Sequence, residues 1–305
     1  MKPTRFVKAF ASALWTLLLA LYLGACSVAP VPGPLPEEPP PVQVIPKKPQ
    51  KIGLVLGGGA ARGFAHIGVI QVLEEAGVHP SLVVGTSAGS LVAALYASGK
   101  TGAQLQQVAE TMEEATFADW TLPIFSRGML RGEGLARYVS AQVNGRLIEG
   151  MPLALGIVAT DLNSGQGVLF QRGDTATAVR ASSAVPALFQ PVRIAGRDYV
   201  DGGLVSPVPV RYARQMGAEL IIAVDISDAP EANAPSDTLQ ILLQTFSIMG
   251  KSINSFELRD ADVVVRPALR GVASSDFGAR GRSIEAGRAA MRAALPQLRT
   301  VLQGH

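Results

Sequence analysis

The sequence predicts an α/β fold with a mostly parallel central sheet. From Lys51 onward, apolar segments that read as buried strands alternate with segments of helical periodicity, and the first two strands both end in glycine-rich turns. Strands that alternate with helices form doubly wound sheets, which carry functional sites at the carboxyl ends of their strands. With 305 residues, of which 48% are hydrophobic and 17% charged, the chain can bury a large core.

The predicted elements follow one another in a regular order. Residues 51–59 form a strand that enters a glycine loop, and residues 64–77 form a helix with Gly77 as its candidate C-cap. Residues 80–87 form the second strand, and residues 88–99 form its helix. Residues 101–144 are mainly helical, with an interruption at 119–134. Further strands are predicted at 153–162, 168–173, 197–203, 217–227 and 261–267, and further helices at 239–258 and 283–298.

The N-terminal residues have the pattern of a secretory signal. Lys2, Arg5 and Lys8 accompany an apolar run at 9–23, which is short for a membrane span of ~20 residues. The run ends in Leu-Gly-Ala-Cys, which resembles the lipobox of bacterial lipoproteins, whose cysteine is lipidated. Cys26 is the only cysteine, and this fits a covalent role better than a disulfide. An uncleaved helical anchor, or a chance cysteine after a plain signal, is the alternative interpretation.

These patterns divide the chain into three parts: a signal peptide at 1–25, a lipidated Cys26 with a tether at 26–50, and a folded domain at 51–305. Nine prolines between residues 30 and 49 favour polyproline II and cannot build a core. A proline-rich ligand for another domain is the alternative to a tether. Ser27 after the cysteine resembles the signal for outer-membrane retention. We therefore expect a lipid-anchored protein of the cell envelope, at the outer membrane and facing the periplasm.

The charge balance argues against a nucleic-acid partner. The formal charge is +3, from 27 basic and 24 acidic side chains. Three of the basic residues lie in the first ten positions, which leaves 27 − 3 = 24 basic against 24 acidic side chains. A neutral body argues against a nucleic-acid partner that is held by phosphate contacts.

Residues 85–89, Gly-Thr-Ser-Ala-Gly, match the G-x-S-x-G nucleophile elbow, in which a serine stands on a strained turn between a strand and a helix. Such a serine normally needs a histidine. His66 and His79 precede Ser87, and the usual order of serine, acid and histidine leaves only His305, a terminal residue that is expected to fray. His66 and His79 are interpreted as a packing residue and a turn residue. Ser87 is therefore either an ordinary turn serine or activated by another group.

The glycine loop at 56–63 points backbone N–H groups at one spot beside a helix N-terminus, which favours a phosphate or an oxyanion. A dinucleotide site would need a third glycine where Arg62 stands, and an acidic residue where the next strand ends in Gly85 and Thr86. The lysine of a Walker loop is absent as well. An oxyanion hole next to Ser87 remains.

A carboxylate is the remaining common base for Ser87. Asp201 ends a predicted strand and precedes two glycines, which leave room around its side chain, and then a proline-rich turn. Asp161 and Asp225 also end predicted strands, and any of the three could be a turn-forming residue.

Four ordered blocks, at 53–70, 83–99, 178–192 and 199–210, together resemble the patatin-like phospholipases, in the bacterial branch that is similar to the catalytic domain of neuropathy target esterase. The resemblance covers residues 51–267 and implies a three-layer α/β/α sandwich with a Ser-Asp dyad. It implies Ser87 as nucleophile, with Gly85 and Gly89 in the elbow, and Asp201 as base. The family's oxyanion loop, G-G-G-x-K/R-G, matches Gly58, Gly59, Ala60, Arg62 and Gly63, with Ala60 in place of the third glycine.

The resemblance implies hydrolysis of carboxylic esters in phospholipids or lysophospholipids, with membrane lipids as substrates and neither metal nor cofactor. A catalytically silent lipoprotein that binds lipid or another protein is the main alternative, and a nucleotide-binding oxidoreductase is a third. Apolar side chains at Trp120, Leu122, Ile124 and Phe125 indicate either a lid at 117–130 or ordinary packing.

Overall fold

β1 (Ile52–Leu56) lies in the interior of the sheet, and its residues are buried on both faces. The structure is a computed structural model, and it describes residues 50–112, 119, 128–227, 237–273 and 275–304. Residues 1–49, with the predicted signal peptide, Cys26 and most of the tether, lie outside the described residues. The described residues belong to one unit, 49–305.

The strands of the described residues form one mixed sheet in the order β5-β6-β3-β2-β1-β7-β8, and β4 also pairs with β3. β3, β2, β1, β7 and β8 run parallel, whereas β4 and β6 pair antiparallel with β3, and β5 pairs antiparallel with β6. The remaining strands are β2 (Leu82–Thr86), β3 (Ala154–Asp161), β4 (Gly167–Phe170), β5 (Val192–Ile194), β6 (Arg197–Asp201), β7 (Leu220–Val224) and β8 (Val263–Val265). The predicted, mostly parallel α/β architecture is confirmed.

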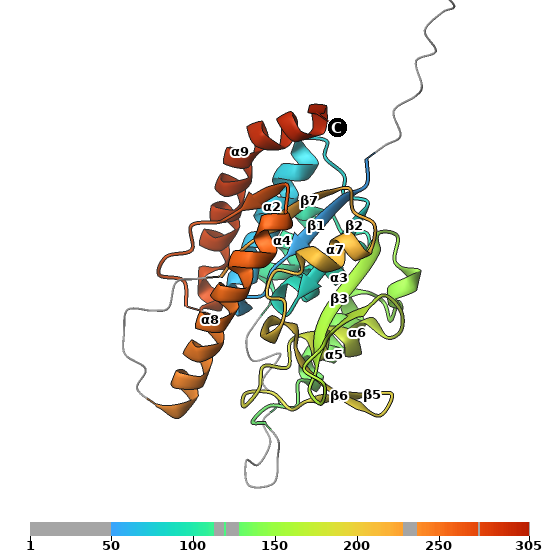
Figure 1. Ribbon diagram of the computed structural model, residues 1–305, viewed down its shortest axis with the longest axis vertical. Coiled ribbons are helices and arrows are strands. Elements are labelled where there is room, and N and C mark those ends of the chain that lie inside the picture. Colours follow the sequence, from blue (N-terminus) through green and yellow to red (C-terminus); the bar gives the residue numbers. More distant parts are fainter. Residues whose placement is uncertain (1–49, 113–118, 120–127, 228–236, 274, 305) are drawn as a thin grey trace, which may run out of the picture. The chain divides into compact units, whose positions relative to one another are not determined.

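Helices cover both faces of this sheet and complete three layers (Figure 1). One face packs against α7, and the opposite face packs against a larger group that includes α2, α3 and α9. The helices are α2 (Ala65–Glu75), α3 (Ala88–Ala97), α4 (Gly102–Glu110), α5 (Glu133–Gln142), α6 (Thr175–Ser182), α7 (Val210–Gln215), α8 (Thr238–Glu257) and α9 (Arg280–Gly304). Short 3-10 turns are η1 (Ala60–Phe64), η3 (Ile148–Gly150), η4 (Gly202–Leu204), η5 (Leu258–Asp260) and η6 (Phe277–Ala279). None of these helices has the length and apolar character needed to cross a membrane.

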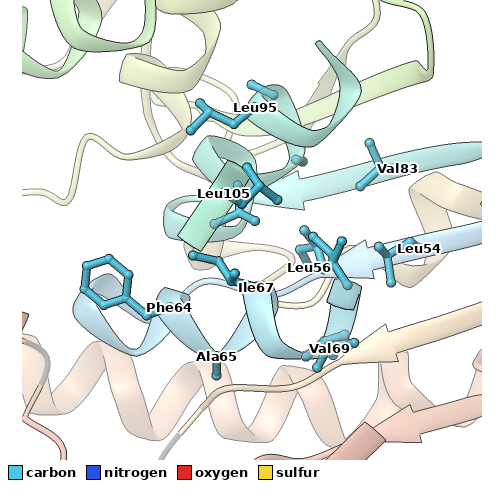
Figure 2. Packing of buried hydrophobic residues seen from close by; sticks show 14 of the residues in the cluster. Leu54, Leu56, Phe64, Ala65, Ile67, Val69, Val83, Leu95 and Leu105 are labelled. Atoms are coloured by element: carbon cyan, nitrogen blue, oxygen red, sulfur yellow. The ribbon is translucent and has the colours of Figure 1, made fainter. Parts of the chain in front are cut away.

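The larger core lies between β1, β2 and the helices of the α2 side. Figure 2 shows Leu56 of β1 beside Ile67 of α2 and Leu54 farther along the strand; Leu95 of α3 and Leu105 of α4 belong to the same cluster. All five side chains are buried. This packing fixes the carboxyl end of β1, where the glycine loop begins.

Three local features differ from the expectation. The proline-rich stretch after Asp201 contains η4 and then α7, which starts directly after Pro209. α6 has few large apolar residues and was not predicted from periodicity. α9 continues through Pro296 to Gly304, beyond the predicted end at residue 298.

Candidate active site

Ser87 stands on a sharp turn between β2 and α3. Its backbone is in a strained conformation, with φ 53° and ψ −125°. A Cβ atom on Gly85 would meet the backbone of Gly89, and one on Gly89 would meet the carbonyl of Leu56. Both elbow positions therefore require glycine, because α3 begins against the ends of β1 and β2.

The turn is held from both sides by serine hydroxyls. The N–H of Ser87 donates to Oγ of Ser182 at 2.9 Å, and that hydroxyl donates to the carbonyl of Val158 at 2.5 Å. Ser90 Oγ donates to the carbonyl of Ser87 at 2.6 Å. Ser182 is fully buried in α6. No sequence signal indicated this role, although Ser182 lies within the block 178–192 that resembles the family.

β3 brings Asp201 to the serine. Thr86 pairs with Val158, and Asp201 pairs with the next residue of β3, Ala159. Thr86, which precedes the nucleophile, and Asp201 thus lie opposite successive residues of β3. This register places Ser87 and Asp201 side by side, as the sequence predicts.

The carboxyl of Asp201 is nearly buried, with 7% of the residue exposed. Burial raises its pKa to about 6, although hydrogen bonds from the Gly203 N–H, at 2.6 Å, and from the Ser87 side chain both favour the charged form. Thr160 Oγ1 fixes the backbone by donating to the carbonyl of Asp201 at 2.8 Å. A carboxylate in this state can accept a proton at neutral pH.

The glycine loop corrects one prediction. The N–H of Gly58 was expected to face the oxyanion, but it donates to the carbonyl of Pro207 at 2.9 Å. The N–H groups of Gly59 and Ala60 form no hydrogen bond with any residue that the structure describes. Gly58 therefore ties the loop to the segment after Asp201, and within the described part of the chain two amides of the predicted three remain available to an oxyanion.

Ala60 adopts a left-handed conformation, φ 48°, at the position where the resembled loop has glycine. Arg62 donates to the carbonyl of Gly59 through both its backbone N–H, at 3.1 Å, and its Nε, at 3.3 Å. A Cβ atom on Gly63 would lie 2.9 Å from Cβ of Ala88 at the start of α3. The hydrogen bonds from Arg62 thus stabilise the turn of the loop, and the lack of a side chain at Gly63 lets the loop lie close to the elbow.

His66 also supports this loop. Its ring is fully buried, and Nε2 lies 2.8 Å from the carbonyl oxygen of Gly57. Because a carbonyl only accepts, Nε2 carries the proton. Burial lowers the pKa of His66 to about 4, so the ring is neutral at pH 7.

The other candidate residues have structural surroundings. His79 is exposed and lies before Pro80, as predicted. Asp161 accepts from Arg197 at 2.9 Å and caps the turn after β3. Asp225 accepts from Ser227 at 2.6 Å and pairs with Arg266 at 3.4 Å. Neither carboxylate lines the cavity described next.

A cavity of about 640 Å³ opens onto Ser87 and Asp201 and has a largely apolar wall. The wall includes the glycine loop with α2, helices α3 to α5, α8, and the segments at 183–189 and 201–207. Its apolar side chains include Leu91, Leu95, Leu105, Met112, Leu135, Leu243 and Phe246. The site is therefore suited to an ester with a long apolar chain.

Most of the predicted lid at 117–130, with Trp120, Leu122, Ile124 and Phe125, lies outside the described residues. Leu130 is described; it is buried and its N–H donates to the carbonyl of Leu188 at 2.9 Å. In the described ranges, no group of three or more His, Cys, Asp or Glu side chains could hold a metal ion.

Comparisons with known proteins bear on the family of this chain. The family model described as patatin-like phospholipase matches residues 54–214. A Mycobacterium tuberculosis protein described as an uncharacterized NTE family protein is 37% identical over 178 residues, which are 58% of this chain and 49% of that protein. Mouse patatin-like phospholipase domain-containing protein 6 is 35% identical over 190 residues, covering 60% of this chain and 14% of the mouse protein. The chain thus spans about half the length of the mycobacterial relative and a small part of the mouse protein.

A solved structure, VipD from Legionella pneumophila, shares the fold with a TM-score of 0.56 at 16% identity, covering 81% of this chain and 67% of VipD.

Proposed function

The chain belongs to the patatin-like phospholipase family, and from that premise we propose that it hydrolyses carboxylic esters of phospholipids or lysophospholipids with Ser87 as nucleophile and Asp201 as base. The observation that carries the proposal is the buried Asp201 carboxyl, hydrogen-bonded by Ser87 on a strained strand-to-helix turn in the wall of an apolar cavity. The fold alone would not support a reaction, because one fold serves many functions.

The proposed reaction has two halves. Ser87 Oγ attacks the ester carbonyl carbon while its proton passes to Asp201, and the N–H groups of Gly59 and Ala60 stabilise the resulting oxyanion. The bond to the alcohol then breaks, and Asp201 returns the proton to the leaving oxygen. A water molecule attacks the acyl-enzyme, gives its proton to Asp201, and releases the fatty acid as Ser87 is reprotonated. The N-terminus of α3 adds a favourable dipole next to the site of negative charge.

Ester hydrolysis by the full chain, with short-chain chromogenic esters and with phospholipids, tests the proposal. Ser87→Ala and Asp201→Asn should each abolish turnover. Ser98→Ala and Asp225→Asn are matched controls, since Ser98 lies at the far end of α3 and Asp225 ends another strand without lining the cavity. Turnover that is equal in all five proteins would exclude the dyad. An unmodified chain inert toward every ester would favour the silent binding module instead.

We also propose that residues 51–305 form the lipase domain and that Cys26, after removal of residues 1–25, carries a lipid anchor that holds the protein at the outer membrane through the tether at 26–50. The Leu-Gly-Ala-Cys sequence supports this proposal. Cys26→Ser should abolish membrane partitioning and change the mature mass. Unchanged partitioning and mass would contradict the anchor.

A further inference from the structure

α8 presents two apolar faces, and among the described residues only one of them packs toward the protein body. Leu243, Phe246 and Gly250 line the cavity that holds Ser87. The structure describes seven exposed large hydrophobic side chains, and five of them lie on α8: Ile241 (52% exposed), Leu242 (42%), Ile248 (53%), Met249 (48%) and Phe256 (62%). Scattered exposed hydrophobics are normal, but a cluster on one helix is not.

The five exposed side chains form a single stripe. Ile241 and Ile248 are seven residues apart, and Leu242, Met249 and Phe256 continue at the same spacing. Seven residues make about two helical turns, so these side chains lie along one side of α8. Leu243, Phe246 and Gly250 project from the other side. We refer to the five residues as the outer stripe.

Few charged residues lie on α8, and two cationic side chains are exposed on the helix or just beyond it, the second of them next to the exposed Asp260. Between Thr238 and Gly250 the helix carries no charged residue, and Lys251 is exposed at the rim of the cavity. Just beyond the helix, the exposed Arg259 places its guanidinium 4.9 Å from the centre of the Phe256 ring. An apolar stripe with cationic side chains beside it is typical of interfacial helices. Asp237, the one acidic residue at the start, caps the helix by accepting from the Gln240 N–H.

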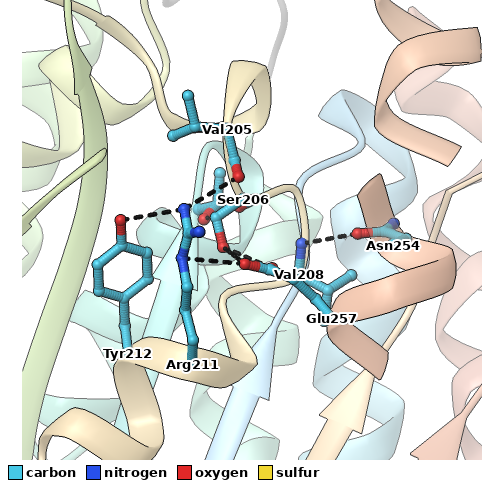
Figure 3. A network of polar contacts seen from close by, with 8 residues as sticks. Val205, Ser206, Val208, Arg211, Tyr212, Asn254 and Glu257 are labelled. Atoms are coloured by element: carbon cyan, nitrogen blue, oxygen red, sulfur yellow. Dashed lines mark hydrogen bonds and ion pairs between the residues drawn. The ribbon is translucent and has the colours of Figure 1, made fainter. Parts of the chain in front are cut away.

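The C-terminal end of α8 is fastened to the segment that follows Asp201, as Figure 3 shows. Ser206 Oγ donates to Glu257 at 2.6 Å, and Arg211 pairs with the same carboxylate at 3.1 Å. The N–H of Val208 donates to Asn254 at 3.1 Å. Glu257, the only acidic residue within the helix, is therefore engaged on the inner side. These contacts fix the C-terminal end of α8, which carries Phe256 of the outer stripe.

We propose that the outer stripe of α8 docks on the surface of a lipid bilayer, so that a lipid enters the cavity from the membrane along the inner face of the same helix. This inference rests on the proposed function and names where the substrate enters. It accounts for the exposed apolar side chains, for the lack of charge along the stripe, and for the position of Lys251 and Arg259 toward anionic headgroups.

The first test separates docking from chemistry in the full chain. Ile241→Gln combined with Ile248→Gln should lower hydrolysis of phospholipid in mixed phosphatidylethanolamine and phosphatidylglycerol vesicles by on the order of tenfold or more, because the substituted side chains no longer bury apolar surface in lipid. Turnover of the water-soluble ester p-nitrophenyl butyrate should stay the same, since neither residue lines the cavity.

Leu147→Gln combined with Leu162→Gln is the matched control, because these are the two exposed large hydrophobic residues of the described chain that lie outside α8. The control should keep both activities. An equal loss of vesicle hydrolysis in both double variants, or no loss in the α8 variant, would overturn the proposal. If the unmodified chain hydrolyses neither substrate, the proposed function fails, and docking is judged by the second test.

The second test measures amide hydrogen exchange and does not depend on catalytic turnover. In the Ser87→Ala chain, the same vesicles should slow amide hydrogen exchange across residues 238–257, and the Ile241→Gln, Ile248→Gln change should remove this protection. Exchange that vesicles leave unchanged would refute docking even in an active enzyme. A third outcome is that the stripe is already protected without vesicles, and that this protection disappears together with a self-associated species seen in sedimentation. That result would assign the stripe to a second copy of the chain and overturn the proposal.

Discussion

Replacing Asp201 by asparagine should make the protein more stable at alkaline pH while it abolishes ester hydrolysis. The carboxyl is buried, and its pKa is about 6 in the folded chain against 3.8 for the free side chain. Because the folded value is the higher one, folding favours the neutral form. The resulting stability is fully present below about pH 4 and is lost as the pH rises through about 6.

The difference between these two pKa values corresponds to about 3 kcal/mol. Asparagine remains neutral at every pH, and its side-chain oxygen can still accept from the Gly203 N–H. Asp201→Asn should therefore raise the free energy of unfolding by up to about 3 kcal/mol at pH 8, and the gain should shrink below about 1 kcal/mol at pH 4. In the unmodified chain, kcat/KM should fall below about pH 6 as the base becomes protonated.

Urea denaturation of both proteins at pH 8 and pH 4 measures the gain, with ester hydrolysis recorded in parallel. Asp225→Asn serves as the control, since it also removes a carboxylate at a strand end but breaks the ion pair with Arg266, and it should give no gain at pH 8. Equal stability of the unmodified chain and Asp201→Asn at pH 8 would refute the reasoning. A gain of the same size at pH 4 would also refute it, because it would have a cause other than the buried charge.

Three further substitutions probe the scaffold of the site. Ala60→Gly should raise the free energy of unfolding by up to about 1 kcal/mol in urea titrations, since relief of the left-handed φ outweighs the added freedom of the unfolded chain; a loss of stability would show that the methyl group packs favourably. His66→Phe should cost about 1–3 kcal/mol, because the buried Gly57 carbonyl loses its donor, and it should lower kcat without moving the acid limb of the pH profile; a shifted limb would make His66 part of the titrating machinery. Gly89→Ala should cost about 3 kcal/mol or more, since its Cβ would collide with the Leu56 carbonyl; thermal unfolding like that of the unmodified chain would contradict this close approach.

The parts of the fold that the sequence predicted are those with strong local patterns. β1, β2 and β7 are apolar runs, and α2 and α3 follow glycine turns, so periodicity and turn residues identified them. β5 and α6 were not identified, because a three-residue strand has no measurable alternation and α6 is rich in small and polar residues. Such elements depend on tertiary contacts.

Some contacts of the candidate site could not be predicted from the sequence, and the cause is similar. The elbow and the Asp201 turn are local motifs, and each could be found in a short window of sequence. Which amide of the glycine loop is occupied depends on the Pro207 carbonyl, and the support of the elbow depends on Ser182. Both are hydrogen bonds between segments far apart in the chain, one to a backbone carbonyl and one to a side-chain hydroxyl, and no local pattern encodes them.

The close contact between α2 and α9 bears on how this chain can be shortened. Cβ atoms on Gly68 or Gly287 would collide with the backbone of the facing helix, so at these two glycines the helices are in direct backbone contact. α9, like β7, follows residue 214, where the match to the family model ends. A fragment that ends at that residue would expose one edge of β1 and one side of α2. Because exposed strand edges pair with other chains, we expect such a fragment to aggregate. Expression work and domain grafting should therefore retain everything through α9.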